Sequence, residues 1–173
     1  VYKSDGEKSH ANSDRSGYRY SILGSLQTIQ KHGNLWECDV IESAGIIERG
    51  HRVTVYTPKI ERITKTFNSR LIEAILMSSY NNGSSIASFG DVSYIDRGRA
   101  DGVEMGNVFE FYGFKDRGTG KNITDNPTYK NGEAVVISLT DNFATVLITA
   151  SRRDFTIGDI AITKTKDAAA RDM

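Results

Sequence analysis

Three histidines and one cysteine are the side chains of this sequence best suited to metal binding or nucleophilic chemistry: His10, His32, Cys38 and His51. Metal sites built from His and Cys use short, characteristic spacings, and no two of these residues have one. Cys38 lies between the apolar residues Trp36 and Val40, which predicts a buried, unreactive thiol in the middle of a strand. We therefore expect no metal, no cofactor and no catalysis. A hydrolase that pairs Cys38 with a histidine stays as a hypothesis, because folding could bring the two together.

The segment Gly118-Thr119-Gly120-Lys121 has the composition of a phosphate-binding loop. That motif also needs a glycine five residues before its second glycine and a Ser or Thr after the lysine. Lys115 and Asn122 occupy these two places, and no helical pattern follows. We predict an exposed loop without phosphate binding.

Nucleic-acid binding is the alternative function, because small barrels bind single strands through basic grooves and stacked aromatic rings. The basic residues that could line such a groove are Arg97, Arg99, Lys115, Arg117, Lys121, Arg152 and Arg153. However, Phe109 and Phe111 alternate with polar residues as core residues do. The 22 basic residues also balance 22 acidic ones, so the chain has no general attraction to phosphate. We expect no nucleic-acid partner.

The composition and the turn-forming residues favour a mainly β protein. The chain has 16 glycines and 2 prolines, and Ser, Thr, Asn and Asp separate short apolar runs, as in tight turns between strands. No apolar run approaches the roughly 18 residues of a membrane-spanning helix, so we predict no membrane span. Residues 1–16 are polar and are predicted to be a disordered tail or a linker, and residues 166–173, polar apart from Ala168–Ala170, are predicted to be a mobile tail. The chain begins with Val1 rather than Met, from which we expect a processed protein or a fragment.

Alternating apolar residues predict several strands. One runs through Trp36, Cys38 and Val40, another through Val53 and Val55, and a third puts Phe109 and Phe111 on one face. The nearly continuous apolar runs 134–139 and 144–148 predict well-buried strands. Residues 70–79 are predicted to form a strand, with a helix as the alternative.

An internal repeat is the strongest feature of the sequence. A shift of 108 residues places Gly24 on Gly132, Ser43 on Ser151 and Gly50 on Gly158 without a gap. A shift of 56 residues places Gly50 on Gly106, so three glycines introduce strands in the same way; such turns favour glycine because it adopts a positive φ without steric cost. We predict two small antiparallel barrel-like units of the SH3 or OB kind, over residues 17–62 and 63–165.

Residues 94–109 carry a recognisable signature. The stretch Tyr94-Ile95-Asp96-Arg97-Gly98-Arg99-Ala100-Asp101-Gly102-Val103-Glu104-Met105-Gly106-Asn107-Val108-Phe109 resembles the C-terminal domain of the flagellar assembly protein T family. That domain also occurs behind LysM domains in envelope proteins, including the LysM protein associated with the type IV pilus secretin. The resemblance continues through Gly132-Glu133-Ala134-Val135-Val136 to Ile157-Gly158-Asp159 and covers residues 70–163. Asn107 departs from the family, which has Asp there.

The resemblance implies a periplasmic, non-enzymatic barrel domain that helps to assemble or brace a ring around a flagellar basal body or a pilus secretin. Its expected partners are proteins of that ring, with further copies of itself among them. No LysM motif is present, so contact with peptidoglycan is expected only through an upstream domain. The predicted structural residues are those of the signature and the turns: Asp96, Gly98, Asp101, Gly102, Gly106, Gly50, Gly158 and Asp159. Asp96 and Asp101 are expected to accept backbone N–H groups in their turn.

Overall fold

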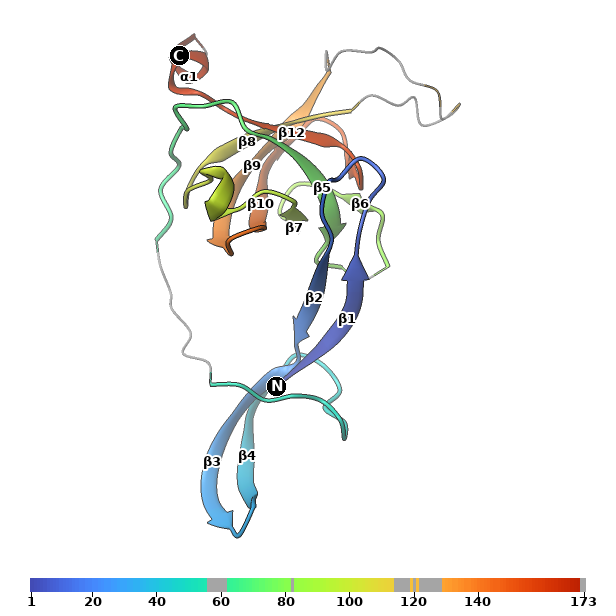
Figure 1. Cartoon of the computed structure of the whole chain (residues 1–173), viewed down its shortest axis with the longest axis vertical. Coiled ribbons are helices and arrows are strands. Elements are labelled where there is room, and N and C mark those ends of the chain that lie inside the picture. The colour runs from blue at the N-terminus through green and yellow to red at the C-terminus, as the bar shows by residue number, and fades with distance from the viewer. Residues whose placement is uncertain (56–61, 82, 114–118, 120, 122–128, 172–173) are drawn as a thin grey trace. The chain divides into compact units, whose positions relative to one another are not determined.

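The protein is mainly β. Its structure is a computed structural model that describes every residue except 56–61, 82, 114–118, 120, 122–128 and 172–173 (Figure 1). The strands are β1 (Tyr2–Lys8), β2 (Gly17–Ile22), β3 (Gly24–His32), β4 (Leu35–Ser43), β5 (Glu73–Ser79), β6 (Ile86–Ala87), β7 (Val92–Ile95), β8 (Val108–Tyr112), β9 (Lys130–Leu139), β10 (Ala144–Ser151), β11 (Phe155–Thr156) and β12 (Ile160–Thr163). The helices of the described residues are a 3-10 turn, η1 (Arg99–Asp101), and a short C-terminal helix, α1 (Lys166–Arg171). The strand predicted within residues 70–79 is confirmed by β5.

The chain divides into two compact units. The first contains Val1–Lys8 and Gly17–Ile60, and the second contains Ser9–Ser16 and Glu61–Met173. The tip of the β1–β2 hairpin therefore belongs to the second unit, although the strands on both sides of it belong to the first. The prediction of a disordered tail over residues 1–16 is wrong, because β1 and this tip are ordered parts of the fold. The predicted C-terminal tail likewise contains α1.

The second unit is a closed antiparallel barrel of six strands in the order β10-β7-β5-β12-β8-β9 (Figure 1). The barrel closes at β12, where Ile160 pairs with Ile75 of β5 on one side and with Tyr112 of β8 on the other. Closure leaves no open edge, so the backbone groups of each strand have a neighbour on both sides. The short strands β6 and β11 form a separate two-stranded sheet in the same unit.

Alternating apolar side chains fill the barrel. Phe109 and Phe111 of β8 are fully buried, as their spacing predicted, and the ring of Phe111 stacks on Phe155 with centroids 4.8 Å apart. Gly132 lies where β9 passes close to its neighbours: a Cβ there would collide with the carbonyl oxygen of Ala150 and lie 2.9 Å from the Phe155 ring. A side chain at this position would therefore disturb both the sheet and the core.

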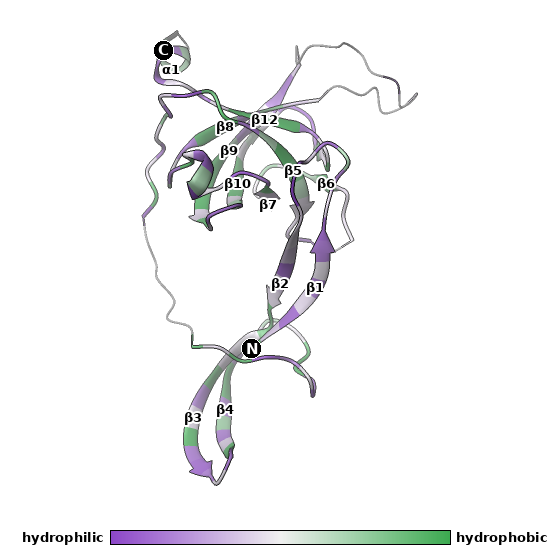
Figure 2. Ribbon diagram, viewed as in Figure 1, coloured by the Kyte–Doolittle hydropathy of each residue, from purple (hydrophilic) through white to green (hydrophobic). Residues whose placement is uncertain are grey.

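The first unit consists of two hairpins and, within the described residues, forms no closed barrel. β1 pairs with β2, and β3 pairs with β4. Figure 2 shows hydrophobic positions along β3 and β4. The strand predicted through Val53 and Val55 is wrong: these side chains are 68% and 96% exposed, and only the preceding Arg52 makes an isolated bridge, to Tyr2.

Replacing Phe155 by alanine should lower the free energy of unfolding by about 3–5 kcal/mol, because it opens a cavity beside Phe111 in the barrel core. Urea denaturation followed by near-ultraviolet circular dichroism measures the loss. Phe89→Ala is the control, since Phe89 is 71% exposed, and it should change stability by less than about 0.5 kcal/mol. Equal effects of the two substitutions would contradict this packing.

Candidate functional site

The signature residues gather at one end of the barrel, around η1. Asp96 follows β7 and is fully buried; its Oδ1 accepts the backbone N–H of Ile75 at 2.7 Å. Asp101 accepts the N–H of Gly98 at 2.8 Å inside the turn. Both carboxylates thus accept backbone N–H groups, the role predicted for them, although the partner of Asp96 lies on β5 rather than in its own turn. These two aspartates hold the backbone in place by accepting its N–H groups.

The glycines of the signature and of the turns have geometric reasons to be glycine. Gly50, Gly106 and Gly158 have φ values of 96°, 83° and 95°, which side-chain-bearing residues rarely adopt. Gly102 ends η1 with φ 89°, whereas Gly98 is extended and packs so closely that a Cβ would lie 2.6 Å from the backbone of the β9–β10 turn. Asp159 accepts the N–H of Thr156 at 2.9 Å. These residues therefore shape the barrel.

The segment Ser9–Ser16 binds to this end of the barrel through charged groups. Arg15 contacts both carboxylate oxygens of Asp101 at 3.0 Å, and Ser13 donates to the second oxygen of Asp96 at 2.6 Å. Arg97 binds Asp14 at 2.8 Å. Sequence reasoning missed these contacts because Ser9–Ser16 has no apolar pattern; the adjacent Asp14 and Arg15 were the available signal.

The pKa values at this contact favour the ion pair. Burial, the largest influence, raises the pKa of Asp101, but the hydrogen bonds from Arg15 and Gly98 and the charge of Arg15 outweigh it, so this pKa lies below its ordinary value. The pKa of Arg15 is raised, chiefly by its hydrogen bond to Asp101. Both groups are charged at neutral pH.

A second charged cluster lies on the outer side of β8 and β9. Lys130 binds Glu110 and Glu133, each at 2.6 Å, and Lys164 binds Glu133 at 3.2 Å. Tyr112 donates to Glu110 at 2.8 Å, and burial followed by this hydrogen bond raises the pKa of Tyr112 to about 12.

The pKa shifts of this cluster oppose acid–base catalysis. Burial raises the pKa of Glu133 and lowers that of Lys130, but their mutual contacts outweigh burial, so the glutamate pKa falls and the lysine pKa rises. A general acid or base at neutral pH needs a pKa near 7. The cluster is a salt-bridge network that holds neighbouring strands together.

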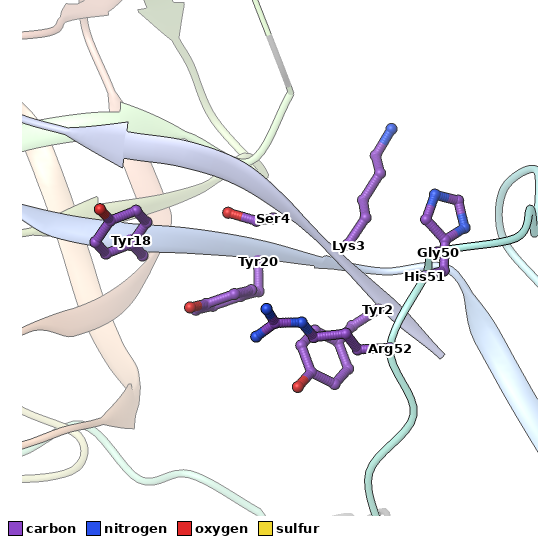
Figure 3. Close-up of a pocket in the computed structure, with 8 residues that line it drawn as sticks. All are labelled: Tyr2, Lys3, Ser4, Tyr18, Tyr20, Gly50, His51 and Arg52. Atoms are coloured by element: carbon purple, nitrogen blue, oxygen red, sulfur yellow. The ribbon is translucent and has the colours of Figure 1, made fainter.

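A shallow pocket in the first unit is lined by tyrosines and basic residues (Figure 3). Tyr2 and Tyr20 meet edge to face with ring centroids 5.6 Å apart, and Arg52 joins the backbone of Tyr2 through two hydrogen bonds. His51 accepts the N–H of Glu48 at 3.0 Å through Nδ1. The lining residues include no carboxylate or thiol.

The histidines His10 and His32 make separate contacts. The ring of His10 packs against Gly158, and His32 binds Glu37 at 2.9 Å in an exposed pair. Among the described residues, no group of three or more His, Cys, Asp or Glu side chains is placed to hold a metal ion. Lys115 and Arg117 lie outside the described residues. Two residues of the segment that resembles a phosphate-binding loop, Gly118 and Gly120, do so as well.

The β3–β4 hairpin is the most apolar exposed surface of the first unit. Trp36 is 58% and Val40 57% exposed, and Cys38 is only partly buried. The prediction that Cys38 is buried among core residues is therefore wrong: the alternation is real, but described residues do not cover this face. Further exposed apolar residues of the hairpin are Ile29, Leu35 and Ile41. Exposed apolar surfaces of this kind are typical of interaction sites in proteins.

No protein-family model, curated protein or solved structure matches this chain. In the part of the chain that the structure describes, no helix is long and apolar enough to cross a membrane.

Replacing Arg15 by glutamine should cost about 1–2 kcal/mol of stability, because it leaves the half-buried carboxylate of Asp101 without its bidentate partner. The control is Arg99→Gln, whose pair with Asp141 is 64% and 77% exposed at the two side chains and should matter little. Urea denaturation of both variants measures the difference.

The cost of Arg15→Gln should also depend on pH. The folded-state pKa of Asp101 is depressed, so its stabilising contribution is present at neutral pH and is lost as the pH falls through that pKa, below about 4. The gap between wild type and Arg15→Gln should therefore narrow in acid. A gap that stays constant from pH 7 to pH 3 would contradict the ion pair.

Proposed function

We propose that this chain is a non-catalytic docking module of the bacterial cell envelope. It resides in the periplasm and helps to assemble or brace a protein ring around a flagellar basal body or a pilus secretin. The compartment and the machine follow from the signature at residues 94–109. The docking role follows from one observation, the apolar β3–β4 face that is exposed to solvent.

A repeated architecture supports this proposal, and we infer that both units descend from one motif. Shifted by 108 residues, every cross-strand pair of β9–β10 coincides with a pair of β3–β4: Ala134 faces Ile148 as Leu26 faces Val40. Irregularities occur at the same places in both hairpins, after Ser25 and Thr28 of β3 and after the matching residues of β9. Two unrelated hairpins would not be expected to share both register and bulges.

The surroundings of the hairpins agree as well. Ser43 donates to the carbonyl of Gly45 at 2.8 Å, and Ser151 donates to that of Arg153 at 2.8 Å. Tyr2 pairs with both Ile22 and Arg52, as Tyr112 pairs with both Lys130 and Ile160. The first unit thus has counterparts of parts of β8, β9, β10 and β12.

The aromatic core of the second unit argues against the alternative of a nucleic-acid-binding barrel. Of the four aromatic residues near the basic ones in sequence, Phe109 and Phe111 are fully buried and offer no ring to a base, whereas Tyr94 and Tyr112 are partly buried. Arg97 and Arg99 are paired with Asp14 and Asp141. The net charge of zero adds no attraction to phosphate.

Site-specific photocrosslinking in the native envelope tests the proposal. A photoreactive amino acid at Ile41, on the exposed hairpin, should crosslink to a secretin, a basal-body protein or another envelope ring component. The same amino acid at Phe89, an exposed position in the second unit, is the control and should give fewer of these products. Crosslinks to cytoplasmic proteins alone, with no envelope component, would contradict the proposed role.

A further inference from the structure

In the barrel, β7 covers the outer edge of the β9–β10 hairpin, which corresponds to β3–β4. In the second unit, β7 runs antiparallel to β10 and pairs Ile95 with Ala144 and Ser93 with Val146. Just before β7, the backbone of Ile148 donates to the carbonyl of Asp91 and accepts from the N–H of Gly90, both at 3.0 Å. This edge of β10 is therefore closed by hydrogen bonds, and Ala144, Val146 and Ile148 are almost fully buried.

The matching edge of β4 is open. β4 pairs only with β3 among the described residues, so nothing described takes the place of β7 and β5. Trp36, which matches Ala144, is 58% exposed where its counterpart is 1% exposed. Val40, which matches Ile148, is 57% exposed against 1%. The hairpin thus presents core-type side chains beside an unpaired backbone edge, which is a template for another strand.

The side chains on the outer face of β4 determine which residues a strand added at its open edge must carry. In β10, Thr145 and Leu147 point away from the core and stand opposite Tyr94 and Val92 of β7. Their counterparts on β4 are Glu37 and Asp39. Opposite charges directly across a strand pair stabilise it, whereas like charges destabilise it. A strand in the place of β7 would therefore need basic residues at the two positions where β7 has Tyr94 and Val92.

A second copy of the same hairpin fits this edge poorly. An antiparallel pair of identical strands keeps each side chain on its own face when the two-fold axis passes through a residue. An axis at Glu37, Cys38 or Asp39 places Glu37 opposite Glu37, Glu37 opposite Asp39, or Asp39 opposite Asp39. Each of these arrangements sets like charges against each other.

We infer that the open edge of β4 receives an extended segment of a partner protein in which apolar and basic residues alternate. Its backbone bonds to the N–H and C=O of Val40, its apolar side chains cover Trp36 and Cys38, and its basic side chains face Glu37 and Asp39. This inference specifies the partner chemistry of the proposed docking module and rests on that function and on the inferred repeat.

Binding of synthetic peptides to the full chain tests the inference. The probe is a fluorescein-labelled Lys-Val-Arg-Val-Lys-Val-Arg peptide, and the control is the same peptide with glutamate at each basic position, both measured by fluorescence anisotropy. The basic peptide should bind at least tenfold more tightly than the acidic one, with the difference shrinking as salt rises. Amide exchange by nuclear magnetic resonance should show new protection at the Val40 N–H.

Charge reversal on the hairpin supplies the decisive variant. Glu37→Lys combined with Asp39→Lys should invert the preference, so that the acidic peptide binds at least tenfold more tightly than the basic one. The control Asp141→Lys lies in the β9–β10 turn and should leave the preference unchanged. Equal binding of both peptides, the absence of binding, or a β4-dependent dimer of the chain itself would each overturn the inference.

These outcomes separate the inference from the function on which it rests. Photocrosslinks to an envelope ring component from Ile41, without peptide binding, would keep the docking role and reject strand addition by a basic segment. Peptide binding without those crosslinks would keep the strand chemistry and reject the proposed machine.

Discussion

A β-strand must satisfy its backbone N–H and C=O groups on both edges, and the two units of this protein meet that constraint differently. In the second unit, β12 joins β5 to β8 and the sheet closes on itself. Closure also decides which residues form a core, because it converts one face of each strand into an interior. Phe109, Phe111 and Phe155 are buried for this reason. In the first unit β4 has one neighbour among the described residues, so similar side chains on its inner face stay on the surface.

Many strands and turns could be predicted from the sequence because their signals are local. Alternation identified β4 and β8, continuous apolar runs identified β9 and β10, and the glycines at positions 50, 106 and 158 lie in turns with positive φ. The 3-10 turn at Arg99–Asp101 was covered by the signature, although the sequence did not indicate its helical form. These features depend on residues that are close in sequence, so a pattern of residue types indicates them directly.

The errors fall where structure depends on distant partners. β1 has almost no apolar alternation, and its pairing with β2 gives order to a stretch that looked like a tail. Ser9–Ser16 is held by Arg15 and Ser13, whose partners Asp101 and Asp96 lie more than 80 residues away in sequence. Cys38 was assigned to a core because its alternation matches that of a buried strand. Periodicity gives the face on which a side chain lies, but it does not show whether anything covers that face.

The two hairpins share a backbone register but have different surroundings. The same register, bulges and Ser side-chain hydrogen bonds appear in β3–β4 and β9–β10, so the backbone of the first hairpin is already shaped for a strand on its outer edge. Such preorganisation lowers the entropy cost of association, because the partner alone must become ordered. Glu37 and Asp39 stand where the barrel has the uncharged Thr145 and Leu147, which limits nonspecific pairing with other edges while leaving room for a cationic strand. Under the proposed docking role, an edge that would be a liability in an isolated hairpin becomes a selective surface when the correct strand is present.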